Sequence, residues 1–185
     1  MTPRCPPLGR DEEGVTLVEL IVYIAIGALF AGLVASIFVS GLHSQAQTRD
    51  RDAATGKAQV VTDMLQASLR NADAVHVDGQ VLVARVATGA TGWECRGWAL
   101  TADGAILYAH GSGVLTTADT TWTPLVGPAD RDGASVSVEG GGDPFTLTGT
   151  QLDYLFTVRA GTASVPVRGS VTPQAVAEEA VSTCW

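Results

Sequence analysis

The chain has 185 residues, a formal net charge of −8 at pH 7 and only 16% charged residues. A length of this order suits one membrane helix followed by one exported domain, since domains commonly have about 50–200 residues. An acidic chain is a poor nonspecific ligand for DNA, because binding to phosphates depends on clustered Lys and Arg. We therefore expect no direct nucleic-acid partner.

An apolar run near the N-terminus contains one acidic residue. Between Val15 and Val39 the only formal charge is that of Glu19. A bilayer span needs about 20 apolar residues, and a charge at its centre costs roughly 2.5–3.5 kcal/mol on insertion scales. The cost is lower near the interface, but an acid kept in such a run is still a functional candidate, and an amine is its natural partner. If the chain were cut after Gly14, the new α-amino group of Val15 would lie about 6 Å from Glu19 along a helix.

The start of this run resembles the prepilin signature of type IV pilin-like proteins, on the residues Gly14, Val15, Thr16, Leu17 and Glu19. In that family a prepilin peptidase cuts after the Gly, the new N-terminus is methylated, and the acid guides assembly. The resemblance therefore implies a cut after Gly14, N-methylation of Val15 and an assembly role for Glu19, with Thr16 and Leu17 beside it. It covers residues 14–39, which is the N-terminal part of the chain.

An ordinary signal peptide or membrane anchor is the alternative interpretation. A signal peptide begins with a basic region, whereas this leader has Asp11, Glu12 and Glu13 beside its Arg residues. Two residues depart from the family pattern. Val15 stands where the family usually has Phe, and Ser36 stands where many major pilins have a Pro that kinks the helix. Under the alternative, Glu19 is incidental and the chain is an anchored or secreted binding domain.

The sequence after the apolar run predicts a continued helix. Residues 44–71 contain no Pro and a single Gly, so we expect one helix from about residue 15 to 71. Its first half, 15–40, would lie in the membrane or in a fibre core. Its second half, 41–72, would pack on a sheet. The apolar face is expected to comprise Val60, Val61, Met64, Leu65, Ala67 and Leu69.

Residues 73–185 are predicted to form an antiparallel β head. Turn signals separate paired strands at 75–77 with 80–86, 93–101 with 105–109, and 152–159 with 163–171. Short strands are expected at 134–138 and 145–147, and one near Trp122. Pro166 indicates an edge strand or a bulge. A long helix followed by antiparallel strands is an α+β fold, which the pilin resemblance also implies.

The cysteines point to one disulfide. Cys5 lies in the predicted leader, whereas Cys95 and Cys184 form an even pair in an exported domain. Two buried free thiols are the alternative. Aromatic residues flank both cysteines, so Trp93, Trp98, Trp122 and Trp185 are expected to pack around the bridge.

Other motifs carry little chemistry. Asp130, Asp132 and Glu139 match the later part of a calcium loop, but Pro128 stands at the first ligand position, so a turn is favoured. The sequence offers no zinc motif and no catalytic triad motif. We therefore expect no enzyme activity, no cofactor and no metal.

The short, sheet-rich head and the sequence from Val22 to Ala25 resemble those of minor pilins or pseudopilins of the J type, and the resemblance implies such a role. The resemblance implies other pilin or pseudopilin subunits, the prepilin peptidase, an inner-membrane assembly platform and the lipid bilayer as partners. It implies a single-pass protein with a cytoplasmic leader and an extracytoplasmic head, which enters a surface fibre. A pilus, a secretion system and a DNA-uptake system remain open.

Overall fold

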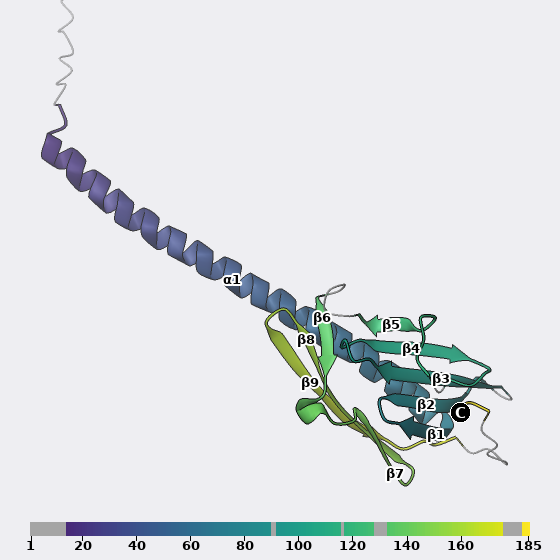
Figure 1. Ribbon diagram of the computed structural model, residues 1–185. Coiled ribbons are helices and arrows are strands. Elements are labelled where there is room, and N and C mark those ends of the chain that lie inside the picture. The colour runs from purple at the N-terminus through teal and green to yellow at the C-terminus, as the bar shows by residue number, and fades with distance from the viewer. Residues whose placement is uncertain (1–13, 90–91, 116, 128–132, 176–182) are drawn as a thin grey trace, which may run out of the picture. The chain divides into compact units, whose positions relative to one another are not determined.

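The computed structural model describes residues 14–89, 92–115, 117–127, 133–175 and 183–185. One long helix, α1 (Leu17–Arg70), is followed by antiparallel strands, which confirms the predicted α+β order (Figure 1). The remaining elements are β1 (Ala72–Asp78), β2 (Val81–Ala87), β3 (Trp93–Leu100), β4 (Ile106–Gly111), β5 (Thr123–Val126), β6 (Ala134–Ser137), η1 (Glu139–Gly141), β7 (Phe145–Thr148), β8 (Gln151–Ala160) and β9 (Ala163–Val171).

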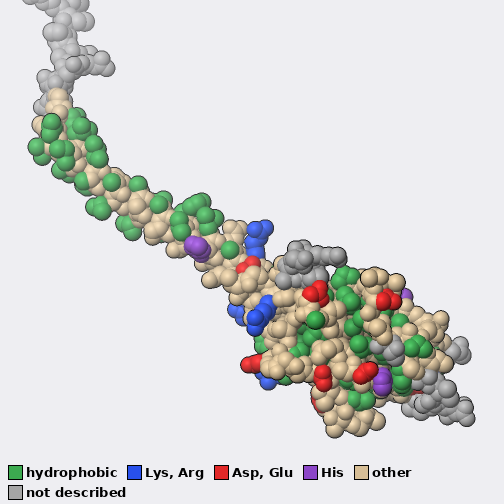
Figure 2. Space-filling model, viewed as in Figure 1, with side chains coloured by type: hydrophobic (Ala, Val, Ile, Leu, Met, Phe, Trp, Pro, Cys, Tyr) green, Lys and Arg blue, Asp and Glu red, His purple; other side chains and the backbone are tan. Residues whose placement is uncertain are grey.

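The chain divides into two compact units, Met1–Ser44 and Gln45–Trp185. In the first unit, every described residue is exposed, although most are apolar. Leu17, Leu29 and Phe30, for example, are 74%, 73% and 68% exposed. Figure 2 shows hydrophobic side chains gathered along the N-terminal part of α1. An apolar surface of this extent requires a lipid or protein environment.

The second unit has a hydrophobic core that the C-terminal part of α1 shares with two sheets. The helix contributes residues at intervals of three and four, which is the spacing of one helical face: Ala54, Ala58, Val61, Leu65 and Leu69. The predicted face was wrong at Val60, which is 49% exposed, and at Ala67, which is also exposed. The true face starts with Ala54 and Ala58 and continues with larger aliphatic residues.

The first sheet has five strands in the order β1-β2-β3-β4-β5. The two hairpins expected from turn signals are confirmed, with Asp78 opposite Val81 and Leu100 opposite Ile106. Gly79 has a φ of 53°, which is the left-handed conformation that Gly adopts at little cost in tight turns. Strand β5 extends the sheet next to the position where a short strand was expected near Trp122.

The second sheet is built around β8, which pairs with β6, β7 and β9. Leu152, Tyr154, Phe156 and Val158 alternate with more exposed neighbours and are buried, as their shared parity predicted. Among the described residues β9 pairs only with β8, so Pro166 lies in an edge strand. The register between β8 and β9 stays constant from the pair Ala160–Ala163 to the pair Leu152–Val171. Strand β9 therefore contains Pro166 without a bulge.

A carboxylate on α1 fixes the β8–β9 hairpin turn. Oδ2 of Asp50 accepts hydrogen bonds from the Thr162 backbone N–H at 2.9 Å and from its hydroxyl at 3.2 Å. Gly161, at the same turn, has a φ of 51°, and a Cβ there would collide with the Asp50 carboxylate. The turn is therefore shaped to receive this one side chain.

Replacing Asp50 with Ala is expected to destabilise this unit by about 1–2 kcal/mol, because two hydrogen bonds to a charged acceptor are lost. The measurement is urea denaturation followed by Trp fluorescence, in detergent. Asp52→Ala is the matched control, since Asp52 is exposed on the same stretch of helix and its loss changes the charge equally. Equal stability of the Asp50 and Asp52 variants would contradict this role for the turn contact.

Candidate assembly site

The residues singled out by the sequence lie at the start of α1. Gly14, Val15 and Thr16 precede the helix, which begins at Leu17. The Thr16 hydroxyl accepts a hydrogen bond from the Glu19 backbone N–H at 3.3 Å. This is the N-terminal half of a Thr-x-x-Glu capping box, which satisfies a backbone donor that a helix start leaves open. Thr16 therefore sets where the helix begins and places Glu19 in its first turn.

The Glu19 side chain has a partner on its own helix. The Tyr23 hydroxyl donates a hydrogen bond to Oε1 of Glu19 at 2.9 Å. The spacing of four residues brings both side chains onto one helical face. A carboxylate in the first turn is also stabilised by the helix dipole, by about 0.3–1 kcal/mol at an exposed site. The acid is thus held at a defined position on α1.

The helix that carries Glu19 is long and apolar enough to cross a membrane. The N-terminal part of α1 is strongly apolar, and its side chains are exposed. At 1.5 Å per residue, about 20 residues cross the hydrocarbon layer. Length and composition thus suit a membrane span with an acid close to its N-terminal end.

Cys95 and Cys184 form the disulfide that their even number predicted, with their Cα atoms 5.4 Å apart. The bridge lies in a small buried cluster with Val83, against which Leu115 and Trp185 pack. The Leu115 N–H donates to the Cys184 carbonyl at 2.9 Å. The disulfide and this hydrogen bond thus hold the segments around Leu115 and Cys184 against the first sheet.

The expectation for the four tryptophans was correct in part. Trp185 packs against the disulfide cluster and stacks on His76, with ring centroids 5.3 Å apart. Trp98 instead belongs to the main core, because its position in β3 points to the opposite face from Cys95. Trp122 is buried over Gly97, where an added Cβ would lie 2.6 Å from the ring. Trp93 lies beside Arg85, whose guanidinium is 5.0 Å from the ring centroid.

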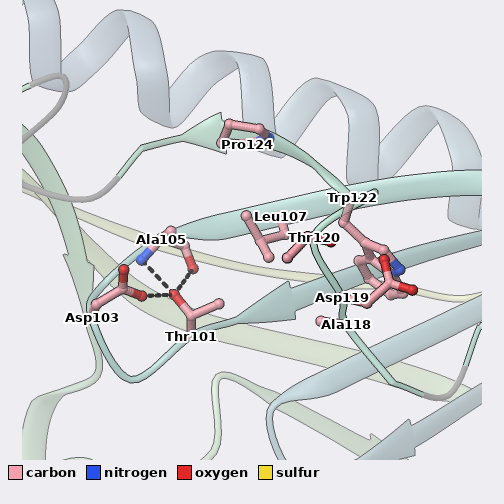
Figure 3. A pocket seen from close by; sticks show the side chains of 9 residues that line it. All are labelled: Thr101, Asp103, Ala105, Leu107, Ala118, Asp119, Thr120, Trp122 and Pro124. Atoms are coloured by element: carbon pink, nitrogen blue, oxygen red, sulfur yellow. Dashed lines mark hydrogen bonds between the residues drawn. The ribbon is translucent and has the colours of Figure 1, made fainter.

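A hollow of about 470 Å³ opens between the β3–β4 turn and the segment before β5 (Figure 3). Oδ1 of Asp103 accepts a hydrogen bond from the Thr101 hydroxyl, so this carboxylate partly stabilises the turn. Asp119 accepts from the hydroxyl and the backbone N–H of Thr121, and these bonds lower its pKa. The lining residues are Thr101, Asp103, Ala105, Leu107, Ala118, Asp119, Thr120, Trp122 and Pro124. Both carboxylates of the hollow thus accept hydrogen bonds from residues two positions away in sequence.

The calcium candidate lies largely outside the described residues. Asp130 and Asp132 are not among them, and neither are Cys5 and the leader residues before Gly14. Glu139 begins η1. In the described part of the chain, no three His, Cys, Asp or Glu side chains are grouped so as to hold a metal ion.

Comparison with protein families identifies the N-terminal segment. Residues 9–35 match the family model described as the prokaryotic N-terminal methylation motif. No curated protein and no solved structure matches the chain. The matched residues include Gly14, Val15 and Glu19 and the first part of the apolar helix. With this motif on a long apolar helix that leads into antiparallel sheets, the chain fits a type IV pilin-like protein.

Proposed function

We propose that this chain is a minor pilin or pseudopilin subunit of a type IV pilus or of a secretion or competence pseudopilus. It is cut after Gly14, N-methylated on Val15 and assembled through α1. One observation carries the proposal: the only charged side chain of the apolar run, Glu19, lies in the first turn of α1 and inside the matched methylation motif.

The chemistry of assembly follows from the low dielectric of an apolar fibre core. A carboxylate or an ammonium group alone in such surroundings is costly, whereas the two together compensate each other. Glu19 of one subunit would neutralise the Val15 amine of a neighbour. Because the partners meet at one axial offset only, the pair rewards the correct register between subunits. The exposed apolar side chains of α1, such as Leu29, then pack against neighbouring helices.

The partners follow from this pathway. The prepilin peptidase removes the leader, an inner-membrane platform extracts the subunit from the bilayer, and other pilin or pseudopilin subunits receive it. The second unit, built on the C-terminal part of α1 and the two sheets, would be the extracytoplasmic head. The chain is then a substrate and a structural part, and it catalyses no reaction.

The N-terminus of the mature protein tests the proposal directly. Mass spectrometry of membrane fractions and of sheared surface fractions is expected to find N-methylated Val15 as the first residue. An N-terminus at Gln47, after a conventional cut behind Ala46, would contradict the proposal and favour a secreted binding domain. An intact Met1 in both fractions would equally contradict it and favour a membrane-anchored one.

A further inference from the structure

The hydrogen bond between Tyr23 and Glu19 joins the only two polar side chains in a long apolar stretch. From Leu17 to Ala35, all other residues are aliphatic, Phe or Gly. The phenol oxygen lies 2.9 Å from Oε1 of Glu19, within the range of a good O–H···O bond. Because Tyr23 is four residues towards the bilayer interior, its hydroxyl reaches the carboxylate from the side where hydrocarbon would surround it.

An ionised carboxylate in hydrocarbon is stabilised chiefly by the donors that reach it. In the described chain, the Tyr23 hydroxyl donates to the Glu19 carboxylate, whereas the Thr16 hydroxyl contacts Glu19 as the acceptor of its backbone N–H. The phenol bond uses Oε1, and within the described residues no side chain donates to Oε2. The arrangement thus fixes the rotamer of Glu19 along the helix and leaves one carboxylate oxygen for an incoming group.

We infer that Tyr23 is a positioning residue for Glu19, and that it presents Oε2 to the amine of a neighbouring subunit during assembly. This inference rests on the proposed function, because the neighbour's amine is the Val15 amine of a processed subunit. While the subunit is alone in the bilayer, the phenol provides the carboxylate with a donor. On assembly the amine adds to the same carboxylate, so the Tyr23 bond need not break.

The test removes only the hydroxyl. Tyr23→Phe keeps the ring and is expected to reduce the fraction of processed chain found in the sheared fibre by about tenfold, since a hydrogen bond to a charged acceptor is lost. Processing after Gly14 should stay at the wild-type level. Tyr108→Phe, which removes a hydroxyl from β4 in the head, is the matched control and should incorporate normally.

A double-mutant cycle separates positioning from packing. If Tyr23 acts through Glu19, Tyr23→Phe should cause no further loss in a Glu19→Gln background. An equal fractional loss in both backgrounds would overturn the inference and assign Tyr23 to helix packing. Wild-type incorporation of Tyr23→Phe would overturn it as well.

A direct readout keeps this inference distinguishable from the proposed function. In lipid vesicles, the full chain with a ¹³C-labelled Glu19 carboxylate is expected to show a different carboxylate chemical shift after Tyr23→Phe. An unchanged shift would refute the phenol bond even if processing and assembly occur as proposed. A changed shift together with normal incorporation of Glu19→Gln would confirm the bond and refute the assembly role of Glu19.

Discussion

Replacing Glu19 with Gln is expected to leave insertion and processing intact and to lower incorporation into the fibre by at least about a hundredfold. The substitution preserves the size of the side chain and removes its charge. If the Val15 amine of a neighbour then stays buried without its counter-ion, the penalty is about 3–5 kcal/mol, which corresponds to more than a hundredfold in an equilibrium. The measurement is the ratio of processed chain in sheared fibres to that in membranes.

Ser36→Ala is the control for this substitution. Ser36 is another polar residue of the same apolar run, and losing its hydroxyl changes no charge. Its variant should incorporate like the wild type, which would show that the loss belongs to the acid. Normal incorporation of Glu19→Gln would count against the charge-pairing role, whereas a block in processing would place the function of Glu19 at the peptidase step.

Much of the fold was predictable because local signals and burial agree in this chain. The period-2 pattern of Leu152 to Val158 and the turn at Asp78-Gly79 are short-range features, and the structure has the strands that they indicate. The division of the strands into two sheets was not predicted. It depends on long-range pairing, such as that of β6 and β7 with opposite ends of β8, which periodicity does not encode.

In the C-terminal part of α1, the positions of apolar residues alone do not identify the buried face. Val60 and Ala67 are exposed, whereas Ser68 is buried and its hydroxyl accepts a hydrogen bond from Arg96 at 2.8 Å. A buried Ser is tolerated on this face because its hydroxyl is hydrogen-bonded. Counting positions at intervals of three and four from Ala54 would have found the correct face.

The prepilin motif predicted the candidate site around Glu19. The structure adds Tyr23, which was not part of that prediction. Tyr23 stands four residues after Glu19, a spacing at which side chains on a helix meet. That signal is present in the sequence, but its meaning depends on the rotamers of both side chains. The contact of Asp50 with Thr162 had no such signal, because 112 positions separate the two residues.

Removing the disulfide is expected to have the largest effect on the stability of the second unit. Cys95 and Cys184 are 89 positions apart in sequence, and closing a loop of this size stabilises the folded state by up to about 4–5 kcal/mol in the chain-entropy model. The bridge also holds Trp185 and Leu115 against the first sheet. The variant Cys95→Ser with Cys184→Ser should therefore unfold at a clearly lower denaturant concentration.

Guanidinium denaturation of the processed chain in detergent measures this effect, with the fluorescence of buried Trp98 as one probe. Wild-type protein under a reducing agent should shift to the same midpoint as the double variant, since both lack the same cross-link. The single variants Cys95→Ser and Cys184→Ser should show the same loss of stability as the double variant, because either substitution removes the disulfide. A double variant as stable as the oxidised wild type would mean that packing in the main core, which includes Leu65 and Phe156, stabilises this unit without the bridge.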